Sequence, residues 1–152
     1  MRNLALLCAL LVGGCASSYN SGRMGFTGGV DAQMITNDTA RISARGNGFT
    51  DRARIVDFTL LKAAETALGQ GFTHFEIINS ADASRVGTLT TPGYAQTNVY
   101  GRTAITTYSP GAVSNYIKPG QDTLVRFCKG SCPGMLPAEE VASNLGARYH
   151  SS

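Results

Sequence analysis

Residues 50–69, TDRARIVDFTLLKAAETALG, are the stretch that decides the fold expected for this chain. Apolar residues recur there at the three- and four-residue spacing of an α-helix and cover much of its circumference. They are Ile55, Val56, Phe58, Leu60, Leu61, Ala63, Ala64, Ala67 and Leu68. Thr50 stands at the expected N-cap, Asp51 follows in the first turn, and Gly69 is a stop signal. We therefore predict a helix that packs on a sheet with one side and meets a second helix with another.

Short strand-like segments flank this helix. Residues 30–35 and 40–44 alternate around a polar turn and predict two antiparallel strands. Residues 72–78 and 123–127 are rich in aromatic and β-branched side chains, which favour buried strands. Residues 137–149 begin with proline and two acids, a helix start. The expected fold class is α+β, a small antiparallel sheet of about four strands with two helices packed on one face.

Residues 83–121 differ in composition from the rest of the chain. They include seven threonines and five glycines but no acidic residue. Residues 98–105 have strand-like content, so part of the segment is expected to form an extended hairpin. Tyrosine offers a large contact area with a polar tip, and loops often carry binding residues. The candidate partner contacts are Tyr94, Tyr100, Arg102, Tyr108 and Tyr116, and the alternative is an insertion without a specific role.

The N-terminus has the pattern of an export signal. Arg2 supplies a positive start, and residues 4–12 form an apolar run too short to span a bilayer, which needs about 20 residues. Leu11-Val12-Gly13-Gly14-Cys15 follows and resembles the lipobox of bacterial lipoproteins. This resemblance implies that Cys15 receives diacylglycerol and an acyl chain and so attaches the protein to a membrane. Ala16 is not the aspartate that retains enteric lipoproteins at the inner membrane, which implies the outer membrane, facing the periplasm.

The expected organisation follows from these features. Residues 1–14 are the signal peptide, residues 15–29 the lipidated cysteine with a flexible Ser/Gly-rich tether, and residues 30–150 one periplasmic domain. The net charge of +3 falls to +2 without Arg2, and such weak basicity predicts no nucleic-acid partner. The low content of charged residues, 15%, suits an exported protein.

Cysteine usage agrees with an oxidising compartment. Cys8 would leave with the signal peptide and Cys15 would be acylated, which leaves Cys128 and Cys132. These two lie in a turn-forming segment and predict a disulfide. Free or regulatory thiols remain an alternative, and so does a metal site, although two thiols supply too few ligands.

Catalytic patterns are weak in this sequence. It contains two histidines, His74 and His150, and no GxSxG, HExxH or phosphate-loop motif. We therefore expect no catalytic residue, no cofactor and no metal. Polar residues gather before and within the first helix, where they could hold an anion or only shape a turn, and we favour the structural interpretation. These residues are Arg45, Asn47, Arg52, Arg54 and Asp57.

Several of these segments together resemble a known family. The RGNGFT turn at 45–50, the DFTLLKAAE helix at 57–65 and the GFTHF strand at 71–75 are similar to those of uncharacterised proteobacterial outer-membrane lipoproteins. The order of strands, helix and late cysteines is distantly similar to the Rcs envelope-stress lipoprotein. Both resemblances imply a location in the envelope, and neither implies an enzymatic activity.

Two functions are therefore expected in order of preference. The first is a non-enzymatic, lipid-anchored protein that binds an envelope protein or a cell-wall component, or has a structural role, in the periplasm. The alternative is an envelope redox or stress sensor that acts through Cys128 and Cys132.

Overall fold

The computed structural model describes Tyr19 and residues 28–150, which contain nine strands and two helices. The strands are β1 (Gly29–Met34), β2 (Thr39–Arg45), β3 (His74–Asp82), β4 (Arg85–Thr91), β5 (Tyr94–Tyr100), β6 (Thr103–Ser109), β7 (Ala112–Lys118), β8 (Gly120–Cys128) and β9 (Leu136–Pro137), and the helices are α1 (Arg52–Gly69) and α2 (Ala138–Tyr149). The expected signal peptide and Cys15 lie outside the described residues. Neither described helix combines the length and the apolar character needed to cross a bilayer.

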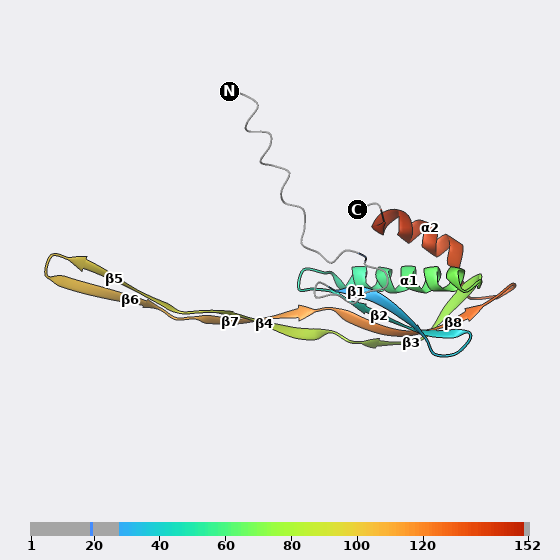
Figure 1. The fold of residues 1–152 in the computed structure, drawn as a ribbon, viewed down its shortest axis with the longest axis horizontal. Helices are drawn as coiled ribbons and strands as arrows, with labels where there is room; N and C mark the ends of the chain where they lie inside the picture. The colour runs from blue at the N-terminus through green and yellow to red at the C-terminus, as the bar shows by residue number, and fades with distance from the viewer. Residues whose placement is uncertain (1–18, 20–27, 151–152) are drawn as a thin grey trace, which may run out of the picture.

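Five of the strands form an antiparallel sheet in the order β1-β2-β8-β3-β9, and α1 covers one of its faces (Figure 1). Because side chains alternate along a strand, one face of β1, β2, β3 and β8 supplies the buried residues that pack against α1. These core residues are Val30, Ala40, Ile42, Ala44, Phe75, Val125 and Phe127. From α1, Phe58 and Leu61 fill the core, while Ala63, Ala64 and Ala67 let the helix lie close to the sheet.

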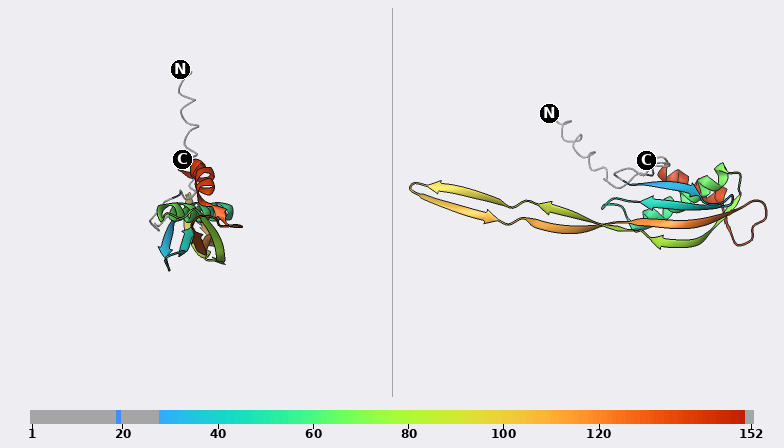
Figure 2. Two further views of the ribbon diagram at one scale, coloured as in Figure 1. Left: turned by 90° about the vertical axis from the view of Figure 1, so that its right-hand side faces the viewer. Right: turned by 60° about the horizontal axis from the view of Figure 1, so that its bottom comes forward.

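The opposite face of the sheet is polar, which is expected of an antiparallel sheet with one face in solvent. It carries three cross-strand pairs, namely Arg45 with Asp122, Arg126 with Glu76, and Arg41 with Gln33. Helix α2 does not cover this face. It packs mainly on the outer side of α1, as Figures 1 and 2 show, so the body has a sheet layer and two helical layers.

A long two-stranded ribbon, the arm (residues 85–118), projects from this body (Figures 1 and 2). Strand β4 pairs with β7 and β5 pairs with β6. After a bulge at Ile78, β3 and β8 adopt the register that the arm then keeps to its tip. The arm is therefore a continuation of β3 and β8. At about 3.3 Å per residue, residues 85–100 span about 50 Å.

The tip of the arm is a two-residue turn between Tyr100 and Thr103, which pair with each other. Gly101 has φ of 63°, and no non-glycine residue described has positive φ. A positive φ at the first central residue only is the geometry of a type II′ turn, which suits the twist of a hairpin. The arm is thus closed by a turn that favours tight pairing of its strands.

The expected fold class is wrong in strand content and in helix placement. Of the described residues, 50% lie in strands and 24% in helices, and these strands form three sheets in place of one small four-stranded sheet. The error lies in residues 83–121, of which only a part was expected to form an extended hairpin. Pro92-Gly93 and Pro110-Gly111 lie side by side in the two strands, because a Cβ on Gly93 would be 2.8 Å from the amide nitrogen of Gly111. These two prolines and two glycines therefore interrupt the strand pairing at a single position along the ribbon.

Candidate functional site

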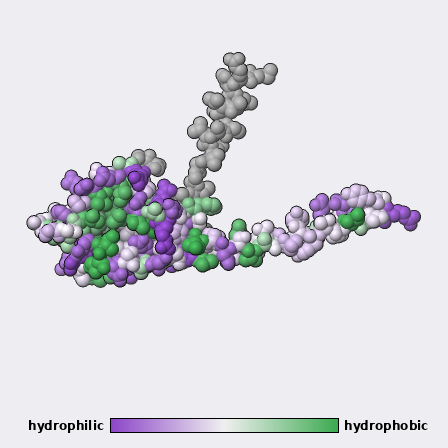
Figure 3. Space-filling model, turned by 180° about the vertical axis from the view of Figure 1, so that it is seen from behind, coloured by the Kyte–Doolittle hydropathy of each residue, from purple (hydrophilic) through white to green (hydrophobic). Residues whose placement is uncertain are grey.

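The arm exposes side chains on both of its faces. Large apolar side chains along it are between 53% and 71% exposed, namely Val86, Leu89, Tyr94, Val99, Tyr100, Ile105, Tyr108, Val113 and Ile117. On the face of the arm that Figure 3 shows, hydrophobic spots are separated by pale or hydrophilic surface. The arm is therefore a polar ribbon with scattered apolar contacts.

The candidate tyrosines do not form one patch. Tyr94 and Tyr100 lie on the same face of β5, because they are an even number of residues apart, and about 20 Å separates them along the strand. Tyr108 lies opposite Ala95 and so projects from the other face, while Arg102 occupies the tip turn. A partner that contacts all of these residues would have to surround the ribbon or lie along one of its edges.

Tyr116 has a different position from the other candidate contacts. It lies at the base of the arm and is 38% exposed. Its ring packs over two glycines, since a Cβ on Gly48 or Gly87 would be 2.5 Å from a ring carbon. The Lys118 ammonium lies 5.6 Å from the ring centroid, within the range of a cation–π contact. Tyr116 thus connects the arm to the turn before α1, a contact that no local pattern in the sequence indicates.

The polar residues near the first helix are used in internal contacts. Arg45 donates to the carbonyl oxygens of Ala44 and Gln121 and lies 2.9 Å from Asp122 Oδ2. The Asp122 pKa is lowered, because hydrogen bonds from Ser43 and Arg45 outweigh the opposite effect of burial. These contacts favour the structural interpretation of Arg45 over an anion site.

Arg52 makes an ion pair at the base of the arm, where its guanidinium lies 2.5 Å from Asp82 Oδ2. The hydroxyl of Ser84 and the backbone N–H of the same residue also bind Asp82, and together with Arg52 they lower the Asp82 pKa to about 2. A depression in the surface beside this pair is lined by Arg52, Ile55, Ser80, Ala81, Asp82, Pro119, Gly120 and Gln121. Its two charged residues therefore neutralise each other, and its walls hold no histidine or cysteine.

The start of α1 differs from the expectation. Asp51, not Thr50, is the N-cap residue, and its side chain makes no capping hydrogen bond. The Thr50 hydroxyl instead donates to Oδ1 of Asn47, 3.0 Å away, and accepts from the Asn47 backbone N–H. Asn47 Oδ1 also accepts from the N–H of Phe49. Asn47 therefore stabilises the turn before the helix.

Arg54 and Asp57, the other two polar residues singled out near the first helix, hold α2 against α1. The Arg54 guanidinium lies 5.9 Å from the Phe58 ring centroid and 5.6 Å from that of Tyr149. The Tyr149 hydroxyl donates to Asp57 Oδ2 at 2.6 Å. Burial, followed by this hydrogen bond, raises the Tyr149 pKa. Asp57 is therefore a helix–helix contact and does not face a ligand site.

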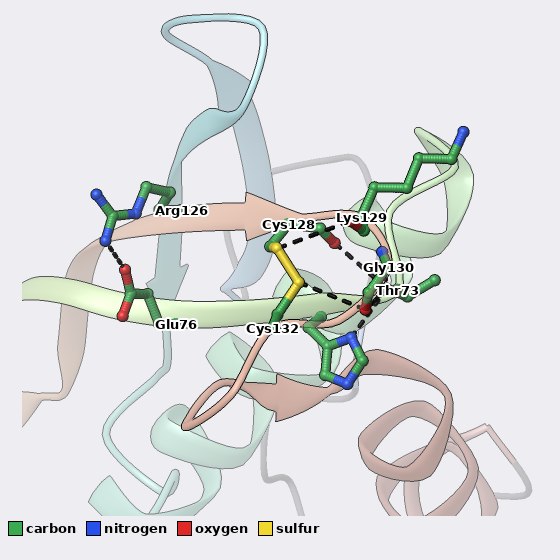
Figure 4. The surroundings of a disulfide bond; sticks show 8 residues. Thr73, Glu76, Arg126, Cys128, Lys129, Gly130 and Cys132 are labelled. Atoms are coloured by element: carbon green, nitrogen blue, oxygen red, sulfur yellow. Dashed lines mark hydrogen bonds and ion pairs between the residues drawn. A yellow bond between two sulfur atoms is a disulfide. The ribbon is translucent and has the colours of Figure 1, made fainter.

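The predicted disulfide between Cys128 and Cys132 is confirmed, with Cα atoms 6.3 Å apart (Figure 4). Cys132 is buried, 8% exposed, and the loop is fixed further because Gly130 N–H donates to the Thr73 hydroxyl at 3.1 Å. The disulfide stabilises the turn between β8 and β9. The regulatory role stays a prediction. In the part of the chain that the structure describes, no three histidine, cysteine, aspartate or glutamate residues are placed to hold a metal.

Comparisons of the chain with protein-family models, with curated proteins and with solved structures found no match.

Proposed function

We propose that this protein is a lipid-anchored, non-enzymatic component of the cell envelope, facing the periplasm, in which the arm is the binding element. The observation that carries the proposal is the arm itself. It extends about 50 Å at the strand rise of 3.3 Å per residue, and its side chains are not needed to fill the core of the body.

The arm is suited to binding because its direction is set by the fold. Beyond the bulge at Ile78 it continues β3 and β8 without a further change of register, and β8 pairs with β2 on its other side. A pre-ordered binding element loses less conformational entropy on association than a flexible loop of the same length. An extended ribbon can therefore present contacts far from the membrane-attached end of the chain.

Membrane attachment through Cys15 remains part of the proposal. Tyr19, four residues later, packs against the hydrophobic core. Four residues span at most about 14 Å, so attachment at Cys15 would keep the helical side of the body close to the lipid. Mass spectrometry of the N-terminal peptide should find the diacylglycerol and acyl modification, and a Cys15→Ala variant should lose both the modification and the membrane fraction.

The binding role is tested by shortening the arm in register. Deleting residues 92–111 and joining Thr91 to Ala112 by Asn-Gly keeps the observed pair Thr91↔Ala112 beside a two-residue turn. In-cell crosslinking and purification should recover a partner with the full chain and not with the shortened chain. Equal recovery from both would contradict a binding role for the arm. Formation of the Cys128–Cys132 disulfide in both chains serves as the control for folding.

A further inference from the structure

Both edges of the arm lack a strand partner among the described residues, and the edge formed by β3, β4 and β5 is the longer of the two. Strand β9 pairs with β3 only at His74 and Phe75. From Glu76 to Tyr100, the outer edge formed by β3, β4 and β5 has no strand partner among the described residues. An open edge presents a row of unpaired N–H and C=O groups, which another strand can satisfy.

We propose that this edge pairs with the same edge of a second copy of the chain, antiparallel, about a two-fold axis between Pro92 and Gly93. This inference rests on the proposed binding role of the arm and names its partner. Strand β4 of one copy would pair with β5 of the other, and β5 with β4. The two ribbons would then form a four-stranded sheet with one body at each end.

The two strands of the edge are matched in length and in side chains. Both contain seven residues, and only Pro92 and Gly93 separate them. Pairing about the proposed axis sets Thr88 opposite Thr97 of the second copy and Val86 opposite Val99. It also sets Arg85 opposite Tyr100, where a cation and an aromatic ring attract each other. An edge that is complementary to itself in this way favours a two-fold dimer.

Charge favours the antiparallel arrangement. No residue from 83 to 121 is acidic, so the arm supplies no carboxylate for Arg102 at its tip. In the antiparallel dimer, Arg102 lies opposite the uncharged Ala83 of the second copy. Arms that point the same way would instead place Arg102 beside Arg102, and like charges in neighbouring strands are unfavourable.

The width of the body also favours the antiparallel arrangement of the two arms. Paired ribbons that point the same way would lie about 10 Å apart, because neighbouring strands are about 4.8 Å apart. Each body contains a five-stranded sheet, which is more than twice as wide. The antiparallel arrangement avoids this clash because the bodies lie at opposite ends of the shared sheet.

The expected contact is large enough for a specific dimer. Two ladders of seven residue pairs would form about 14 main-chain hydrogen bonds, against about 10 in a typical protein interface. An isolated two-stranded ribbon is only marginally stable, and a third and fourth strand stabilise it. Residues 86–101 also contain no charged side chain, so the edge lacks the lysines that commonly prevent pairing.

Cysteine crosslinking of the full lipidated chain in membranes tests the register. Copies carrying Thr88→Cys should form an intermolecular disulfide with co-expressed copies carrying Thr97→Cys. The matched control combines Thr88→Cys with Thr106→Cys, because Thr106 lies opposite Thr97 on the other strand of the arm. A yield no higher than in the control would overturn the proposal. Efficient crosslinking of Thr97→Cys copies to Thr106→Cys copies would also overturn it, because that pattern indicates arms that point the same way.

Lysine substitutions provide a second measurement that needs no engineered thiol. Thr88→Lys with Thr97→Lys should weaken dimerisation of the purified chain by about tenfold or more, because two pairs of like charges would face each other across the two-fold axis. Asn115→Lys with Thr106→Lys adds the same charge to the strand on the other side of the arm and should leave the dimer intact. Equal effects of both double variants on the mass measured by light scattering would contradict this edge.

Failure of this inference and failure of the proposed function give different results. A chain that stays monomeric, and whose partner capture still depends on the arm, would overturn self-pairing while the binding role stands. A chain that is monomeric and whose capture is unchanged by arm shortening would overturn both.

Discussion

Tyr19 and Glu65 lie 46 residues apart in the chain and are joined by a hydrogen bond of 2.5 Å from the tyrosine hydroxyl to Oε2 of the glutamate. The Tyr19 ring packs edge-on against Phe58 and His150, with ring centroids 5.4 and 5.2 Å apart. Nε2 of His150 lies 2.7 Å from the other oxygen of Glu65. The Tyr19 side chain is therefore fixed at the junction of α1 with the end of α2.

Removal of this contact should destabilise the body. We expect Tyr19→Ala to lower the free energy of unfolding by about 2 kcal/mol, because an aromatic pair and a hydrogen bond are lost together. Tyr94→Ala is the matched control, since Tyr94 is 66% exposed on the arm. It should change stability by less than about 0.5 kcal/mol. Denaturant titration of both variants measures the difference, and equal effects would contradict the role of Tyr19.

Phe58 should be among the most sensitive core positions. It is fully buried and contacts Tyr19, Tyr149 and Arg54 in three different segments. We expect Phe58→Ala to lower the free energy of unfolding by about 3–5 kcal/mol through lost burial and the cavity left behind. Phe49→Ala is the control, because Phe49 is 78% exposed. A small effect at Phe58 in thermal or denaturant unfolding would show that α2 and Tyr19 do not depend on this ring.

The pKa of Asp82 should report on the base of the arm. Hydrogen bonds from Ser84, followed by Arg52, lower this pKa to about 2 from 3.8. A carboxyl with a lowered pKa stabilises the fold above its unfolded pKa, and this contribution is lost as the pH falls from about 4 through about 2. Titration followed by NMR should show the low value in the natural chain and a higher one in Ser84→Ala. Ser114→Ala, which alters a distant serine of the arm, should leave the Asp82 pKa unchanged.

The disulfide should be permanent and of modest energetic importance. Trypsin cleaves after Arg126, Lys129 and Arg148, so unreduced digests should contain peptides 127–129 and 130–148 joined by the bond. We expect replacement of Cys128 and Cys132 by serine to lower stability by about 2 kcal/mol or less, because the closed loop is short. Reversible reduction and alkylation of both thiols in intact cells would instead support the redox alternative.

The elements of the body could be predicted because their patterns are local. The helical spacing in residues 50–69 corresponds to α1, and alternation at 30–35 and 40–44 corresponds to β1 and β2. The arm was not predicted at full length because glycine and proline are weak evidence about pairing. Only the facing positions of Gly93 and Gly111 in the two strands show that the breaks coincide.

The candidate site was predicted in part for the same reason. The composition of residues 83–121 differs from that of the rest of the chain, which drew attention to this segment. Its candidate contact residues, the four tyrosines and Arg102, do lie on the arm. The separation of Tyr94 and Tyr108 onto opposite faces depends on strand register, which composition does not define. The edge from Glu76 to Tyr100 is open because β9 pairs with β3 at only two positions. The two residues of β9, Leu136 and Pro137, form no sequence pattern that would predict a strand.

By itself, the sequence determined the amphipathic helix, the core strands around it, the cysteine pair and the acid-free segment. These features follow from spacing along the chain, because a helix or strand buries whichever residues recur with its own period. Only the tertiary structure decided that the acid-free segment continues β3 and β8, that α2 lies on α1, and that the edge from Glu76 to Tyr100 is left unpaired. These outcomes depend on contacts between residues far apart in the chain, where packing and register outweigh local preference.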